Sequence, residues 1–379
     1  MAKRIFLSPP WVGQPERDAV SAAFDSGYVA PCGPLVDELD RRLGELAGQH
    51  AAAVASGTAA LDLLMAELAV GPGTAVVASS LTFIATVGPA VHRGAKPVFV
   101  DSDPATGTVS IPLLESALAA LRRTHRGPVV VLAADIYGQC CDYDALEAVC
   151  ARFAATLVVD AAEAVGATCR ARPAGCAGAA AVYSFNGNKI ITTSGGGAVL
   201  SRDPEIVARA KWRAQQSRER VVHYEHREVG YNYRMSNLLA GLGCAQLDRL
   251  PEIVRRKRRT FAAYCELFGC APDTPFRPRA RDVQPFPCDA SCTASTRWLS
   301  VFVFPTAAAR DAVAARLDAA DVENRPVWQP MHLQPVFKGC RAWGGEVSEA
   351  LFRRGLCLPS GAGLTRAQFD RVARAIRGN

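Results

Sequence analysis

Short apolar runs alternate with helical patterns between residues 50 and 200, and this alternation constrains the fold more than any other feature. Four runs are typical of buried strands and lie at residues 74–80, 96–103, 128–135 and 155–162. Apolar residues recur at helical spacing between them, at residues 59–68 and 111–123. Strands that alternate with helices predict an α/β fold with a mostly parallel sheet that helices cover on both faces. Such sheets bind ligands in the loops at the carboxyl ends of their strands.

The pattern changes after a helical segment at residues 235–250, which Pro251 is expected to disturb or restart. Two further strands and two further helices are predicted, the strands at residues 297–305 and 355–359 and the helices at 306–322 and 365–377. These elements predict a second, smaller α+β domain. We therefore divide the chain into a large domain of residues 1–250 and a C-terminal domain of residues 251–379.

Composition excludes several classes of protein. No uninterrupted apolar stretch approaches the roughly 20 residues that a membrane-spanning helix needs, and the N-terminus lacks the apolar core of a secretion signal. We expect a cytoplasmic protein without a membrane partner, whose thirteen cysteines are small buried hydrophobic side chains rather than disulfides or metal ligands. Much of the excess charge behind the net +7 lies in residues 254–261, where a solvated helix face is favoured over a nucleic-acid site.

The stretch SFNGNKIITTSGGGAVL, residues 184–200, places Lys189 just after a predicted strand and its polar turn, next to two isoleucines. Partial burial in such a setting frees a lysine amine for nucleophilic attack on a carbonyl. Ser184, five residues earlier, can reach an anion beside the amine. The alternative is a lysine that covers a strand end with its methylene stem, and the stretch alone does not decide between the two.

Three more stretches carry polar or aromatic residues at the ligand-binding end of the predicted sheet. Ser-Gly-Thr at residues 56–58 precedes an amphipathic helix, whose first N–H groups either form a phosphate seat or are merely capped. Asp160 ends an apolar strand, where a carboxylate needs a partner, either a following helix that it caps or a protonated ring nitrogen. Phe83 either covers a flat heteroaromatic cofactor or is an ordinary core phenylalanine.

Taken together, these residues are the parts of a pyridoxal 5'-phosphate site. The lysine holds the aldehyde as a Schiff base, and the acid keeps the pyridine nitrogen protonated so that the ring accepts electrons from the substrate carbon. The order along the chain also fits, since the phosphate seat comes first, then the aromatic residue, the aspartate and the lysine.

The motifs around these residues resemble the DegT/StrS-type (DegT/DnrJ/EryC1-like) sugar aminotransferases over nearly the whole chain. The motifs are SGTAAL, TFIAT, GAKPVFVD, VVDAAEAVGA, SFNGNKIITTSGGG, GYNYRMSNLLAGLG, QPMHLQPVF and GLCLPSG. The likeness is greatest to the enzymes of bacillosamine and perosamine synthesis, which aminate C4 of 4-keto-6-deoxy nucleotide sugars. The resemblance implies a pyridoxal phosphate-dependent transferase of fold type I, with L-glutamate as the amino donor and a nucleotide sugar as the acceptor.

The resemblance also implies roles for single residues. Lys189 would bind the cofactor covalently and act as the catalytic base and acid, and Asp160 would face the pyridine nitrogen. Phe83 would stack on the ring, and Glu163 would contact the cofactor.

The remaining implied roles concern the phosphate, the partner subunit and the substrate. Gly57, Thr58 and Ser184 would hold the cofactor phosphate. Asn232 would reach the phosphate of the neighbouring subunit, which implies a homodimer with shared active sites. Arg325 and His332 would line the sugar-nucleotide cleft.

Other functions remain open at this point. Relatives that dehydrate sugars carry histidine in place of the lysine, so Lys189 favours amino transfer. The same fold could act on another sugar carbon or on an amino alcohol, or it could sense a ligand without catalysis. A nicotinamide dehydrogenase is disfavoured because SGGGA, residues 194–198, leads into a strand and not into a helix.

Overall fold

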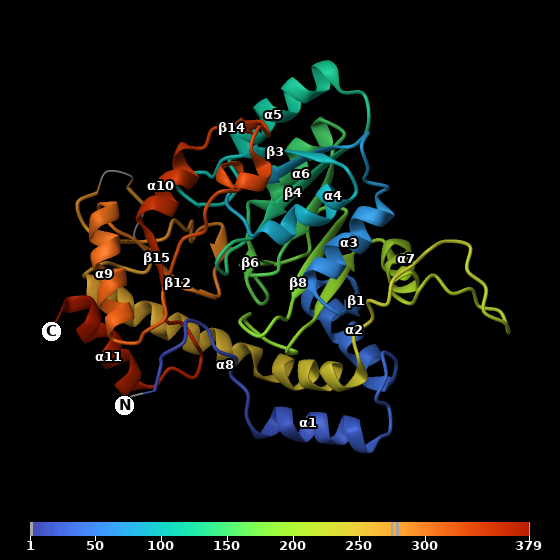
Figure 1. Cartoon of the computed structure of the whole chain (residues 1–379), viewed down its shortest axis with the longest axis horizontal. Helices are drawn as coiled ribbons and strands as arrows, with labels where there is room; N and C mark the ends of the chain where they lie inside the picture. The colour runs from blue at the N-terminus through green and yellow to red at the C-terminus, as the bar shows by residue number, and fades with distance from the viewer. Residues whose placement is uncertain (1–2, 274–275, 278–279, 379) are drawn as a thin grey trace.

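The computed structural model describes residues 3–273, 276–277 and 280–378 (Figure 1). Its centre is an eight-stranded sheet with the order β1-β9-β8-β5-β4-β2-β3-β14. The strands are β1 (His50–Val54), β2 (Ala75–Ser79), β3 (Lys96–Val100), β4 (Val129–Ala134), β5 (Thr156–Asp160), β8 (Ala180–Ser184), β9 (Gly197–Ser201) and β14 (Ala342–Trp343). All neighbouring pairs are parallel except those that include β9. The predicted mostly parallel sheet is therefore confirmed.

Helices cover both faces of this sheet, as the alternation of elements predicts. They are α2 (Pro34–Ala47), α3 (Gly57–Glu67), α4 (Gly88–His92), α5 (Ile111–Thr124), α6 (Tyr143–Arg152) and α7 (Pro204–Ala214). Neighbouring strand residues point to opposite faces, so Val130 and Val158 belong to one apolar cluster, while Val131 and Val159 belong to the other. Burial on both faces explains why these strands are continuous apolar runs and do not alternate with polar residues.

Helix α8 (Asn237–Phe268) is longer than the sequence predicts, because it runs through Pro251 without a break. Along it packs α1 (Gln14–Asp25), at the bottom of Figure 1. Proline removes one N–H from a helix, and α8 nevertheless continues to Phe268 while it packs against α1 and α2. The proposed division at residue 250 therefore falls inside a helix, and it stays a prediction.

A second, four-stranded sheet follows α8 in the chain, with the order β10-β12-β15-β13. Its strands and flanking helices are β10 (Gln284–Pro285), β12 (Ser300–Val303), β13 (Arg325–Pro326), β15 (Gly355–Leu358), α9 (Ala307–Ala319), α10 (Glu346–Arg354) and α11 (Arg366–Arg377). Backbone pairings join this part to the rest. Strand β14 extends the large sheet by pairing with β3, and Ile5 near the N-terminus bridges to Val322. The sequence predicts neither link.

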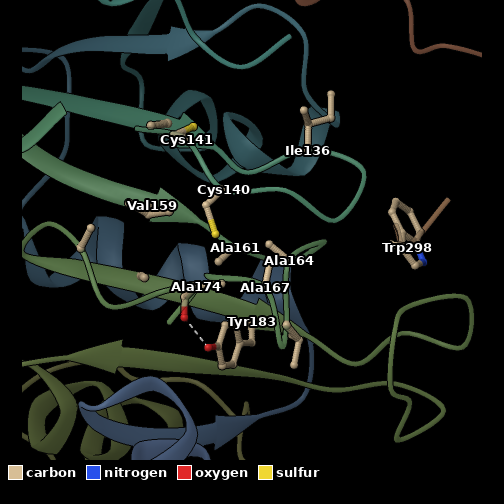
Figure 2. Packing of buried hydrophobic residues seen from close by; sticks show 14 of the residues in the cluster. Ile136, Cys140, Cys141, Val159, Ala161, Ala164, Ala167, Ala174, Tyr183 and Trp298 are labelled. Atoms are coloured by element: carbon tan, nitrogen blue, oxygen red, sulfur yellow. Dashed lines mark hydrogen bonds between the residues drawn. The ribbon is translucent and has the colours of Figure 1, made fainter. Parts of the chain in front are cut away.

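Most of the cysteines fit their predicted role as small buried residues, but Cys32 is exposed. All thirteen are free and nine are buried, and Figure 2 shows Cys140 and Cys141 among apolar side chains such as Val159. Cys169, Cys292 and Asp142 hold three potential metal-ligand atoms within 4.8 Å of one another. Arg170, however, already donates to both carboxylate oxygens of Asp142, at 2.6 and 2.9 Å.

The helices of the described part of the chain include none that is long and apolar enough to cross a membrane.

Candidate active site

A cavity of about 250 Å³ lies at the carboxyl ends of β4, β5 and β8. Seven of the ten residues singled out in the sequence line it, and these are Gly57, Thr58, Phe83, Asp160, Glu163, Ser184 and Lys189. This is the position at which parallel sheets bind ligands.

The amine of Lys189 lies in the wall of this cavity. Its side chain is only 13% exposed, and Nζ lies 3.2 Å from Glu163 Oε1. The same nitrogen lies 4.4 Å from the ring centroid of Trp298, at cation–π distance. The neighbouring Ile190 and Ile191 are buried. A lysine that only covers a strand end would extend its amine to solvent, so the enclosed position favours the reactive alternative.

Asp160 is the last residue of β5 and is also buried. The Thr86 hydroxyl donates to Asp160 Oδ2 at 2.6 Å, and the backbone N–H of Ala162 donates to Oδ1 at 3.1 Å. Turns and then β6 (Thr168–Cys169) follow β5, so the alternative in which Asp160 caps a helix is wrong. Two donors hold the carboxylate in place, and its remaining lone pairs can accept a hydrogen bond from a group in the cavity.

Glu163 and Asp135 are two further carboxylates in the cavity wall. Burial raises the pKa of Glu163 to about 7, against the opposing effects of the Lys189 amine and of the backbone N–H of Tyr137. Burial likewise raises the pKa of Asp135 to about 7, although the hydroxyl of Tyr143 donates to it. Asp135 was not singled out in the sequence, yet it follows an apolar run just as Asp160 ends one.

Replacing Glu163 with glutamine (Glu163→Gln) is expected to make the stability of the cofactor-free protein less sensitive to pH. The folded-state pKa lies above its ordinary value. The folded protein therefore keeps a proton that the unfolded chain releases, and the free energy of unfolding falls as pH rises through that window. Glutamine has no such proton. Between about pH 5 and pH 8, the free energy of unfolding should therefore fall by about 1–3 kcal/mol less in the variant than in the wild type.

Urea unfolding of both proteins at these two pH values measures this difference in free energy. Asp135 is present in both proteins, so its own contribution cancels in the comparison. An equal fall in the two proteins would contradict a raised pKa at Glu163.

The start of α3 lines the cavity. Ser56 caps the helix by accepting the N–H of Ala59 at 2.9 Å. In the described part of the chain, the N–H groups of Gly57 and Thr58 have no hydrogen-bond acceptor, as expected for the first turn of a helix. A Cβ on Gly57 would lie 3.0 Å from Ser184 Cβ, so the glycine lets the serine approach closely. Two free N–H groups and a hydroxyl at the positive end of a helix suit an anion.

Aromatic side chains also line the cavity. Phe83 is 54% exposed, so the alternative of a core phenylalanine is wrong. Its ring centroid lies 5.5 Å from that of Trp328, which in turn lies 5.4 Å from that of Tyr137. Trp298 and Trp328 line the cavity and come from the C-terminal part of the chain. The sequence around Trp298 carries no local signal of a site, whereas Trp328 directly precedes the QPMHLQPVF motif.

The other three residues singled out in the sequence lie outside this cavity. Arg325 lines a larger neighbouring cavity of about 950 Å³, which shares Phe83, Asn188 and the two tryptophans with the first. His332 is not in either lining, since its ring lies between Ser80 (2.6 Å) and Glu349 (3.3 Å).

Asn232 is exposed at the end of a segment that follows α7 and extends away from the large sheet (Figure 1). Its role toward a second subunit stays a prediction, as do the substrate-binding roles of Arg325 and His332.

Known proteins resemble this chain over its whole length. The model of the DegT/DnrJ/EryC1/StrS aminotransferase family matches residues 11–377. EpsN of Bacillus subtilis (strain 168), named as a pyridoxal phosphate-dependent aminotransferase, is 39% identical over 381 residues, which cover 99% of this chain and 96% of EpsN. A GDP-perosamine synthase of Caulobacter vibrioides is 33% identical over 376 residues, or 98% of this chain and 97% of the synthase.

Among solved structures, DesI crystallised in the presence of its TDP-sugar product is 28% identical to this chain. The superposition has a TM-score of 0.85 and covers 100% of this chain and 94% of DesI. The chain therefore belongs to the DegT/DnrJ/EryC1/StrS aminotransferase family and is a pyridoxal phosphate-dependent aminotransferase.

Proposed function

We propose that this chain transfers an amino group from L-glutamate to the C4 keto group of a nucleotide-linked 4-keto-6-deoxy sugar. The product would serve the synthesis of a surface polysaccharide or glycan. The proposal is carried by one observation, that the Lys189 amine and the Asp160 carboxylate line the same small cavity. The neighbouring cavity of about 950 Å³ has room for a substrate much larger than an amino acid. Relatives named for GDP-perosamine and for a TDP-sugar product support a nucleotide sugar.

The residues of the cavity fit pyridoxal phosphate. The free N–H groups of Gly57 and Thr58, together with the Ser184 hydroxyl, would hold its phosphate, and Asp160 would accept a hydrogen bond from its ring nitrogen. Phe83 at the rim would cover the ring. When bound, the cofactor supplies a carbonyl that takes up the amino group and a ring that withdraws electrons from the reacting carbon.

The side chains then have separate tasks. Lys189 binds the cofactor covalently between turnovers and, once released, moves a proton to and from the substrate carbon as general base and acid. Glu163 accepts a hydrogen bond from the amine and orients it. Asp160 would face the ring nitrogen of the cofactor, and Thr86 holds the carboxylate in place. A second subunit would complete the site through Asn232.

The proposal is tested by incubating the purified protein with L-glutamate and a panel of ketosugar nucleotides. The panel varies the nucleotide and the position of the keto group, and it includes an amino-alcohol precursor. Mass spectrometry should detect the exchange of oxygen for nitrogen in a 4-keto-6-deoxy sugar, together with release of the 2-oxo acid. Amination only at another carbon or only of the amino-alcohol precursor would replace the proposal by that activity. A lack of product with every donor and acceptor would favour a ligand-sensing relative.

A further inference from the structure

Lys257 of α8 has a buried amine that the proposed mechanism does not use. It lies in the basic stretch that the sequence predicts to be a solvated helix face, but it is only 2% exposed. The prediction of a helix is correct there, and the prediction of solvation is wrong at this residue. Among the described residues, no carboxylate pairs with its amine, and burial lowers the pKa of Lys257 to about 7. The cost of burying this group must be offset by the hydrogen bonds that it makes.

Three oxygens surround the amine of Lys257. It donates to the Ser8 hydroxyl at 3.3 Å, to the carbonyl of Trp298 at 3.0 Å and to the carbonyl of Ser360 at 2.9 Å. The protonated form of the amine has three N–H donors, so the acceptors match the donors of that form in number. They come from the N-terminal segment, from the segment before β12 and from the segment after β15. One side chain therefore ties together three segments that are far apart in the sequence.

Two of these segments also contact the loop that carries Lys189. The indole N–H of Trp298 donates to the carbonyl of Asn188 at 2.7 Å, and the Ser8 hydroxyl donates to the same carbonyl at 3.0 Å. Asn188 directly precedes Lys189, whose amine lies against the Trp298 ring. The contacts therefore run without a gap from Lys257, through Trp298 and Ser8, to the proposed reactive amine.

We propose that Lys257 is a positioning residue for amino transfer, which holds the Trp298 ring and the Asn188 carbonyl where they direct the Lys189 amine into the cavity. The proposal rests on the proposed function, because it assigns the reactive amine to Lys189. Lys257 itself contacts neither the cavity nor the reacting atoms. Its effect passes through Trp298, and this separates the proposal from a purely structural role.

A double-mutant cycle between Lys257 and Trp298 tests this route. Lys257→Met removes the donors and keeps a stem of similar length, and Trp298→Phe keeps a ring but removes the N–H to Asn188. Each variant is expected to lower kcat about tenfold and to change KM for glutamate less than about twofold, since a small displacement of a reacting group costs rate more than binding. The loss of kcat in the double variant should be clearly smaller than the product of the two single losses, because both changes disturb the same chain of contacts to Lys189.

Tyr264→Phe is the matched control. Tyr264 lies on the same helix and donates to the carbonyl of Pro359 at 3.0 Å, next to Ser360, without contacting Trp298 or Lys189. We expect this variant to lose stability and to keep its kcat. If Lys257→Met does not fold, Ser8→Ala takes its place, because it removes one acceptor and one contact to Asn188 while it keeps the amine.

A second measurement needs neither cofactor nor turnover. The chain has only six lysines, so acetic anhydride labelling of the cofactor-free protein can be followed at each lysine by peptide mass spectrometry. Acetylation of Lys189 relative to the exposed Lys96 and Lys338 is expected to rise about fivefold in Lys257→Met, because the amine loses its cation–π cover and its fixed position. It should not rise in Tyr264→Phe.

Two results would contradict the positioning role and leave Lys257 a structural residue. One is a loss of kcat in the double variant that equals the product of the two single losses, and the other is unchanged labelling of Lys189 in Lys257→Met. Neither result would affect the proposed function. The proposed function has its own test, because it would be contradicted if Lys189→Ala still catalysed amino transfer.

Discussion

Replacing Lys189 with alanine (Lys189→Ala) is expected to lower kcat for amino transfer by about 10³-fold or more. The variant loses both the covalent attachment of the cofactor and the group that moves the proton at the reacting carbon, and the second task alone contributes about 10²–10⁴-fold. Turnover of L-glutamate with a nucleotide ketosugar, measured at saturating cofactor, gives the comparison. The visible absorption of the lysine-bound cofactor should disappear in the same variant.

The matched control for this variant is Lys338→Ala. Lys338 is exposed and lies outside both cavities, so its kcat should stay within about twofold of the wild type, as for most surface changes. A Lys189→Ala protein that keeps more than about a tenth of wild-type turnover would contradict general acid–base catalysis by this amine.

Replacing Asp160 with asparagine (Asp160→Asn) is expected to lower kcat by about 10²–10³-fold, which is the usual cost of losing one preorganised charge contact. The amide has nearly the same shape, and its single oxygen can still accept from either Thr86 or the backbone N–H of Ala162, but not from both. It cannot supply the negative charge that keeps a ring nitrogen protonated. Steady-state kinetics measure the loss, and circular dichroism shows whether the variant is folded.

Asp101 offers a close structural control for this change. It directly follows β3, as Asp160 ends β5, and its carboxylate is buried and accepts the N–H groups of Gly345 and Ser348 at 2.7 and 2.9 Å. It lies outside both cavities. Asp101→Asn should therefore cost about 1–3 kcal/mol of stability and leave kcat within about twofold. Similar kcat losses in the two variants would mean that Asp160 is also structural.

The sequence predicts the large sheet well because its strands obey a local rule. Residues such as Val130 and Val131 are buried on opposite faces, so the whole strand is apolar and easy to recognise. Strand β1 is not predicted, because its HAAAV sequence is rich in alanine, which has little preference for strands. The pairing of β14 with β3 joins two-residue segments from distant parts of the chain, and no local pattern encodes such a contact.

The residues of the site also divide into those that the sequence predicts and those that it does not. Asp160, Ser184 and Lys189 follow or end strands of one sheet, so topology alone brings them together at its carboxyl edge. Trp298 reaches the Lys189 amine from the C-terminal part of the chain, and its approach depends on Lys257 and on how α8 packs. The sequence shows a charged residue in a basic helix there, which is most often solvated. Only the three-dimensional contacts show that this lysine is enclosed.

The central claim is that the cofactor is bound covalently to one particular amine in the cavity with Asp160. The most direct test is to reduce the cofactor-loaded protein with borohydride, digest it and locate the cofactor mass by peptide mass spectrometry. Six lysines at well-separated positions make the assignment unambiguous. We predict that the added mass is found on the peptide that contains Lys189 and on no other lysine. Added mass on Lys211 or Lys257, or no covalent adduct at all, would contradict the account.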